Sequence, residues 1–173
     1  MDKSFGFIHE KIDIKILILF VLRRLPDPIS FDTLTELVMC DGGIGYFDYA
    51  QCVAELVQTD HIKIKDGMYS ATAKGARNGE ATEKSLPFSV RMSAEKSTSV
   101  LRAAQGRDSM IKTVHLANPD GGYTVELSLS DGVGVIVSME LYATDEHQAA
   151  AMEKGFRKNA ESVYHALIDK LLG

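Results

Sequence analysis

Cysteine is scarce in this sequence of 173 residues. Cys40 and Cys52 are the only two, and neither belongs to a CxxC pair or to a Cys/His group spaced for zinc. This pattern does not fit a zinc ribbon or a secreted disulfide scaffold. We therefore expect no metal site and a reducing, cytoplasmic environment.

A long apolar run is also missing. The longest, Ile16–Leu22, is far shorter than the roughly 20 residues that a membrane-spanning helix needs. The acidic residues Asp2, Glu10 and Asp13 before it, and Arg23-Arg24 after it, do not fit a signal peptide. We expect no membrane partner.

An excess of positive charge is the third absence. The chain has 19 Lys and Arg against 24 Asp and Glu, a net charge of −5. Residues 1–85 carry 10 basic and 13 acidic residues, and residues 86–173 carry 9 and 11. Neither half is basic, so any contact with nucleic acid would have to come from a local patch.

Apolar residues, in contrast, are plentiful. They make up 45% of the chain, and a chain of this size typically buries about two-thirds of its unfolded surface. A core can therefore form without disulfides or metal. The length suits one domain or two small ones, at about 150 residues per domain.

The first half of the chain changes from helical spacing of its apolar residues to alternation near residue 61. Three helices are expected, over residues 12–25, from Ser30 to about 40, and over residues 46–60. Next, Ile62–Lys65 and Met68–Thr72 alternate on either side of Asp66-Gly67, which favours a two-residue hairpin turn. A short helix, Ala73–Asn78, and the small, polar stretch Gly79–Ser85 follow, so a domain boundary is expected there.

The second half begins with an expected helix over about 88–104. Three strands follow, over residues 110–117, 123–130 and 133–142, with turn residues between them. A long helix over about 145–171 ends the chain. We therefore expect an α+β protein with two domains, residues 1–80 and residues 86–173, the second an α-β-β-β-α domain with a three-stranded antiparallel meander.

The order of three helices and a hairpin resembles the winged helix-turn-helix of transcriptional regulators such as the PadR-like and MarR-like families. The resemblance rests on Lys15–Leu19, Ile29–Leu34, Leu56-Val57, and the hairpin with its exit through Ala71–Gly75. The whole chain also resembles a bacterial family of unknown function, built from a winged helix and a small α/β domain. In that family a segment like Gly45-Tyr46-Phe47 opens the third helix. The resemblance implies that residues 1–80 are a DNA-binding domain and that residues 86–173 are a sensing or dimerisation domain.

A regulator of this kind places its third helix in the major groove of double-stranded DNA and its hairpin, the wing, on the phosphate backbone. The expected DNA-binding residues lie on that helix, on the wing and just beyond it: Tyr46, Asp48, Gln51, Lys63, Lys65, Lys74 and Arg77. Gln51 suits adenine, and the four cations suit phosphate.

Acidic side chains on the third helix favour an alternative. Its outer face is expected to carry Asp48, Gln51, Glu55 and Gln58, and carboxylates close to phosphates oppose DNA binding. The alternative is a winged-helix protein–protein interaction module that does not bind DNA. The sequence leaves both hypotheses open.

No pattern indicates an enzyme or a cofactor. The sequence has no G-x-S-x-G, and Gly43-Ile44-Gly45 lacks the third glycine and the preceding strand of a dinucleotide-binding motif. His147 and His165 lie on one expected helix, but about 27 Å apart, so they cannot share a metal ion. We expect no catalytic residue.

Two features of the second domain suggest partners. Thr124, Glu126, Ser128, Ser138 and Glu140 are expected on one polar face of the meander, which is either solvated or binds a small-molecule effector. The last helix has apolar residues on more than one side. We expect a homodimer through Phe156, Tyr164 and Ile168, as a palindromic DNA site would require, with packing inside the chain's own core as the alternative.

Overall fold

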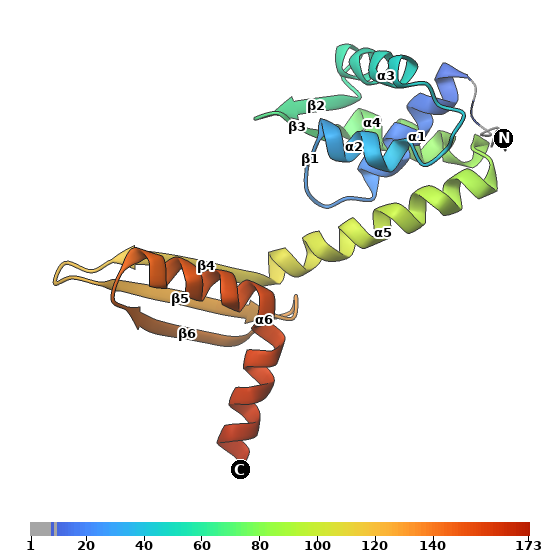
Figure 1. The fold of residues 1–173 in the computed structure, drawn as a ribbon. Coiled ribbons are helices and arrows are strands. Elements are labelled where there is room, and N and C mark those ends of the chain that lie inside the picture. Colours follow the sequence, from blue (N-terminus) through green and yellow to red (C-terminus); the bar gives the residue numbers. More distant parts are fainter. Residues whose placement is uncertain (1–7, 9) are drawn as a thin grey trace, which may run out of the picture. The chain divides into compact units, whose positions relative to one another are not determined.

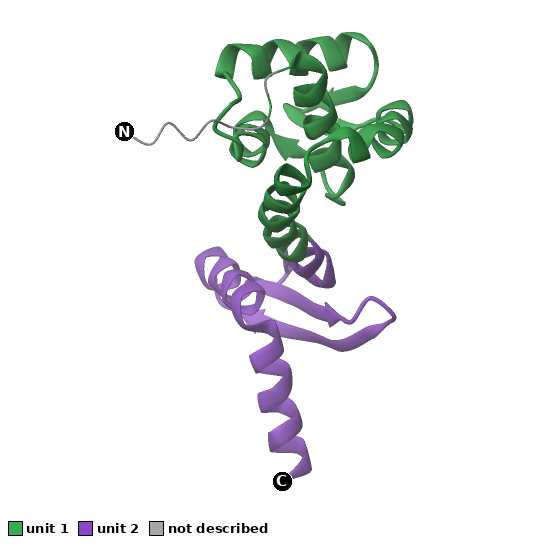
Figure 2. Ribbon diagram, turned by 90° about the vertical axis from the view of Figure 1, so that its right-hand side faces the viewer, with its two compact units in different colours: residues 1–105 green, residues 106–173 purple. Residues whose placement is uncertain are grey.

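The computed structural model describes residue 8 and residues 10–173, so residues 1–7 and 9 of the first expected domain lie outside the described residues. The described residues form six α-helices, one short 3₁₀-helix and two three-stranded antiparallel sheets, with a strand-rich C-terminal part. This confirms the predicted α+β class. No helix among them is both long and apolar enough to cross a membrane. The chain forms two compact units, which we call unit 1 (residues 1–105) and unit 2 (residues 106–173) (Figure 2).

Unit 1 begins with the three expected helices: α1 (Lys11–Arg23), α2 (Phe31–Val38) and α3 (Tyr46–Gln58) (Figure 1). Every residue of the apolar run Ile16–Leu22 is buried, which makes α1 the centre of the unit 1 core. Ser30 caps α2, because its Oγ accepts a hydrogen bond from the backbone N–H of Thr33 at 3.1 Å.

The sheet of unit 1 contains β1 (Ile29–Ser30), β2 (Ile62–Lys65) and β3 (Met68–Ala71), in the order β1-β3-β2. Asp66 and Gly67 connect β2 to β3 with φ values of 53° and 76°. Positive φ at both positions is typical of the turn that matches the twist of a hairpin. The predicted hairpin is therefore confirmed.

The stretch expected to be a linker is helical instead. Residues 79–85 belong to α4 (Ala73–Thr82) and to the 3₁₀-helix η1 (Glu83–Ser85), and α5 (Phe88–Met110) follows. Gly79 lets α4 approach α1, since an added Cβ would lie 2.7 Å from Cδ of Arg23 and 3.1 Å from Cβ of Leu19. Val90 and Ala94 of α5 also belong to the core of unit 1. Residues 79–105 consequently belong to unit 1, and unit 2 begins at Gly106.

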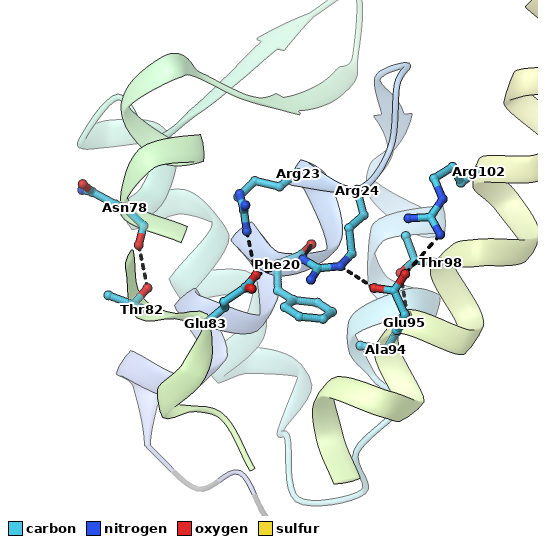
Figure 3. A network of polar contacts seen from close by, with 10 residues as sticks. All are labelled: Phe20, Arg23, Arg24, Asn78, Thr82, Glu83, Ala94, Glu95, Thr98 and Arg102. Atoms are coloured by element: carbon cyan, nitrogen blue, oxygen red, sulfur yellow. Dashed lines mark hydrogen bonds and ion pairs between the residues drawn. The ribbon is translucent and has the colours of Figure 1, made fainter. Parts of the chain in front are cut away.

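Two arginines at the end of α1 hold η1 and α5 in place (Figure 3). Oε2 of Glu83 accepts two hydrogen bonds, from Nη1 of Arg23 at 2.7 Å and from Nη1 of Arg24 at 3.2 Å. Nε of Arg24 also donates a hydrogen bond to the carboxylate of Glu95. The guanidinium of Arg24 also lies over the Phe20 ring, with 3.4 Å between Cζ and the ring centroid. Burial raises the pKa of Glu83 and Glu95, but hydrogen bonds from arginines outweigh it and hold both pKa values below the usual range. Both carboxylates thus stay charged at neutral pH.

Unit 2 is the predicted meander, with β4 (Ile111–Ala117), β5 (Tyr123–Ser130) and β6 (Val135–Ala143), followed by α6 (Glu146–Leu172). α6 begins after Asp145, whose Oδ1 accepts a hydrogen bond from the backbone N–H of Gln148 at 2.8 Å. The buried side chains of this unit come from the sheet and α6: Ile111, Val125, Leu127, Leu129, Ala143, Ala149, Phe156 and Ala160.

Glu153 fastens α6 to β4. Its carboxylate accepts a hydrogen bond from Oγ1 of Thr113 at 2.7 Å and another from Nδ1 of His115. The bond from His115, followed by the bond from Thr113, lowers the pKa of Glu153. A carboxyl whose folded pKa is depressed stabilises the fold above its unfolded pKa, about 4.3 for Glu, and this contribution is lost as the pH falls through the folded value.

We expect Glu153→Gln to reduce the free energy of unfolding of unit 2 by about 1–2 kcal/mol at neutral pH, because a charged acceptor of two hydrogen bonds is lost. The difference from the wild type should shrink as the pH falls below the unfolded pKa, about 4.3 for Glu, and disappear once the pH is below the lowered folded pKa, where the wild-type carboxyl is protonated as well. Urea unfolding followed by circular dichroism at a series of pH values measures this. Glu161→Gln, at an exposed position of α6, is the control. A difference that is constant with pH would contradict the prediction.

Candidate functional site

The first turn of α3 presents two aromatic rings to solvent. Tyr46 is 51% exposed and Phe47 87%, and their rings meet edge to face with centroids 5.9 Å apart. Asp48 beside them is also exposed. The next aromatic residue, Tyr49, is buried, and its hydroxyl accepts a hydrogen bond from Oγ1 of Thr35 at 3.1 Å. Burial raises the pKa of Tyr49 to about 12. Tyr49 therefore anchors α3 on α2 and leaves the first turn accessible.

The middle of α3 is bonded to α1. Nζ of Lys11 donates to Oε1 of Gln51 at 2.6 Å, and Nε2 of Gln51 donates to Oε1 of Glu55 at 2.9 Å. Nζ of Lys15 forms an ion pair with Oε2 of Glu55 at 2.6 Å, and this contact lowers the pKa of Glu55. Gln51, expected to read a base, thus has both ends of its amide engaged within the chain.

The four cations expected to bind phosphate lie in three different settings. Lys65 is exposed next to the hairpin turn. Lys63 of β2 and Arg77 of α4 line one cavity. Nζ of Lys74 donates to the carbonyl oxygen of Thr59 at 2.8 Å, just after α3 ends, so this lysine satisfies a backbone group.

Sequence reasoning missed a charge pattern that spans α2 and α3. Between Leu25 and Ile62 there is no lysine or arginine, whereas seven residues are acidic. These are Asp27, Asp32, Glu36, Asp41, Asp48, Glu55 and Asp60. Counting basic and acidic residues over this segment alone reveals the pattern. Over residues 1–85 as a whole, the basic residues outside the segment conceal it. The helix pair therefore presents acidic and aromatic side chains, with no cation of its own.

α6 separates the three residues expected at a dimer interface. Its backbone leaves helical geometry at Asn159 (φ −124°, ψ 17°), and the part beyond this bend extends away from the sheet (Figure 1). Phe156, before the bend, is 4% exposed in the core of unit 2, so a partner cannot reach it. Tyr164 and Ile168 are half-buried. Near the end of α6, Leu171 and Leu172 are 78% and 82% exposed.

The polar face expected in the meander is present. Glu126 of β5 pairs with Glu140 of β6, and Ser128 pairs with Ser138. Buried Val125 and Leu127 alternate with these residues, so the polar side chains lie on the opposite face. Among the described residues, no group of three or more His, Cys, Asp or Glu side chains is arranged to hold a metal ion.

Comparison with known families gives a match to the model of a domain of unknown function, DUF4364, over residues 14–171. The chain belongs to the DUF4364 family. The match includes both compact units, as the resemblance to a full-length family of unknown function implied. The resemblance to PadR-like and MarR-like regulators receives no support from it. No curated protein and no solved structure matches this DUF4364 chain significantly.

Proposed function

We propose that unit 1 of this DUF4364 protein is a winged helix that binds a protein partner, a segment rich in lysine and arginine, through α2 and the first turn of α3. The winged-helix interpretation is supported by the order α1, β1, α2, α3, β2, β3 and by β1 adding a third strand to the hairpin. The observation that carries the choice of partner is the absence of Lys and Arg from Leu25 to Ile62.

The charges on unit 1 support a protein partner over DNA. Duplex DNA carries one negative charge per roughly 1.7 Å of its axis, and proteins that bind it commonly make about 6–10 cationic phosphate contacts. Here Asp32, Glu36 and Asp48 are exposed on the helix pair, and Lys63 and Lys65 are the two cations of the hairpin. These exposed carboxylates would repel phosphates, which supports a protein partner.

The same side chains suit a basic peptide. The methylene groups of a lysine or arginine pack against aromatic rings, and its charge interacts with a ring face or a nearby carboxylate. Tyr46, Phe47 and Asp48 supply both kinds of contact side by side. Binding would also cover a Phe side chain that is 87% exposed.

DNA binding, as part of transcriptional regulation, is the second candidate. It is favoured by the winged-helix order and by the exposed Lys63 and Lys65 on the hairpin that follows α3. For either candidate we propose a non-enzymatic role. We also propose a cytoplasmic location, because Cys40 and Cys52 are both unpaired thiols, as is usual in a reducing compartment.

One titration separates the two candidates. We expect the full chain to bind a fluorescein-labelled Arg- and Lys-rich peptide at least 10-fold more tightly than an acidic peptide of equal length, and Asp48→Lys to abolish this preference. A random-sequence DNA duplex should bind no more tightly than about 10⁻⁶ M at physiological salt.

Asp120→Lys makes the same charge change at an exposed position of unit 2 that is not part of the proposed surface, and it should leave peptide binding unchanged. Equal binding of basic and acidic peptides would contradict the proposal. Tight DNA binding whose salt dependence falls by about one unit of slope per lysine in Lys63→Ala/Lys65→Ala would establish the second candidate instead.

We also propose a homodimer through the last part of α6, residues 163–172. Apolar residues recur there at three- and four-residue intervals, at Val163, Tyr164, Leu167, Ile168, Leu171 and Leu172. Such spacing forms a continuous stripe along one side of a helix, and two copies can pack their stripes together.

A further inference from the structure

Unit 1 has a cavity beside its sheet that the proposed peptide surface does not use. It has a volume of about 520 Å³ and lies between β2, the end of α1 and α4. This is within the range of small-molecule sites, about 300–1,000 Å³. Much of its wall is apolar, formed by Leu22, Leu25, Pro26, Pro28, Ala71 and Ala76.

Charges of both signs surround this apolar wall. Lys63 and Arg77 line the cavity, and so do Asp27 and Glu80. Within the described part of the chain, none of these four side chains has a hydrogen-bond or ion-pair partner. Arg23, which also lines the cavity, is already paired with Glu83 at 2.7 Å. The cavity thus offers two unpaired cations and two unpaired carboxylates.

We propose that this cavity binds a free α-amino acid with a large apolar side chain. Lys63 and Arg77 receive the ligand's carboxylate, which a guanidinium can hold with two parallel hydrogen bonds. Asp27 and Glu80 receive its ammonium group, and the apolar wall takes the side chain. The balance of charges decides the ligand class. All four charged side chains are exposed. A simple carboxylate would be repelled by both acidic side chains and a simple amine by both cations, whereas a zwitterion is attracted by each pair.

Titration calorimetry of the full chain with L-leucine and two matched analogues tests this inference. 4-Methylpentanoate lacks the ammonium group of leucine, and 3-methylbutylamine lacks the carboxylate. We expect leucine to bind at least 10-fold more tightly than either analogue, and backbone amide NMR signals of Ala71 and Ala76 to shift on saturation.

Two single variants locate the site. Arg77→Ala and Glu80→Ala should each weaken leucine binding at least 10-fold, whereas Lys84→Ala, a charge change in η1 outside the cavity lining, should not. Equal affinity for leucine and 4-methylpentanoate would overturn the amino-acid assignment. Absence of saturable binding, or binding unaffected by both variants, would overturn the site itself. None of these outcomes depends on whether the α3 surface binds a peptide.

Discussion

Replacement of Gly75 by alanine is expected to lower the free energy of unfolding of unit 1 by about 3 kcal/mol, the upper end of the usual cost of overpacking. An added Cβ would lie 2.0 Å from the carbonyl oxygen of His61 and 2.9 Å from its carbonyl carbon. That oxygen also accepts a hydrogen bond from the backbone N–H of Thr72 at 3.0 Å. Because the obstacle is backbone held at the start of β2, it cannot rotate away as a side chain would.

Thermal and urea unfolding of the Gly75→Ala variant measure this effect. Gly155→Ala is the matched control, because this glycine of α6 has no heavy atom within 4 Å of an added Cβ. There the higher helix propensity of alanine should stabilise unit 2 by up to about 1 kcal/mol. If the Gly75→Ala protein were as stable as the wild type, α4 would not approach His61 so closely.

The second large effect concerns assembly. We expect the wild-type chain to have about twice the monomer mass of 19.0 kDa in multi-angle light scattering at micromolar concentration. Leu167→Glu/Leu171→Glu should weaken this association at least 100-fold, because burying four unpaired carboxylates in a symmetric interface costs several kcal/mol. Circular dichroism should be unchanged, since these leucines are 38% and 78% exposed in the single chain.

Ser162→Glu supplies the control for this experiment. Ser162 is exposed on α6, nine residues before Leu171, so at 3.6 residues per turn it lies on the opposite side of the helix. It should leave the dimer intact. A monomeric wild type, or a dimer that survives both leucine substitutions, would contradict the proposed interface.

The elements that the sequence predicted best are those controlled by a few neighbouring residues. Asp66-Gly67 turns β2 into β3 because both residues adopt positive φ, which needs no help from the rest of the chain. Ser30 and Asp145 cap α2 and α6 with hydrogen bonds to residues only three positions ahead. Apolar and polar residues likewise alternate along β5. This alternation places the buried Val125 and Leu127 on the face opposite the polar side chains.

Predictions from composition were wrong where a residue type is compatible with two different roles. Gly79–Ser85 has the composition of a linker, but Gly79 is small in order to pack against α1. Lys74 has the charge of a phosphate ligand, but it binds the carbonyl oxygen of Thr59, 15 residues earlier. The residue type shows which interactions a side chain is able to make. The residue that it contacts in the folded chain determines which of these interactions forms.

The sequence by itself therefore determined the α+β class, the hairpin, the meander and the acidic outer face of α3. Tertiary structure alone decided that Gln51 is held by Lys11, 40 residues away, that Phe156 is buried, and that Lys63 and Arg77 share a cavity with Asp27 and Glu80. The physical reason is the distance along the sequence over which each kind of interaction acts. Turn, cap and periodicity effects act within one or two turns of the chain, whereas burial and pairing depend on which distant segments pack together.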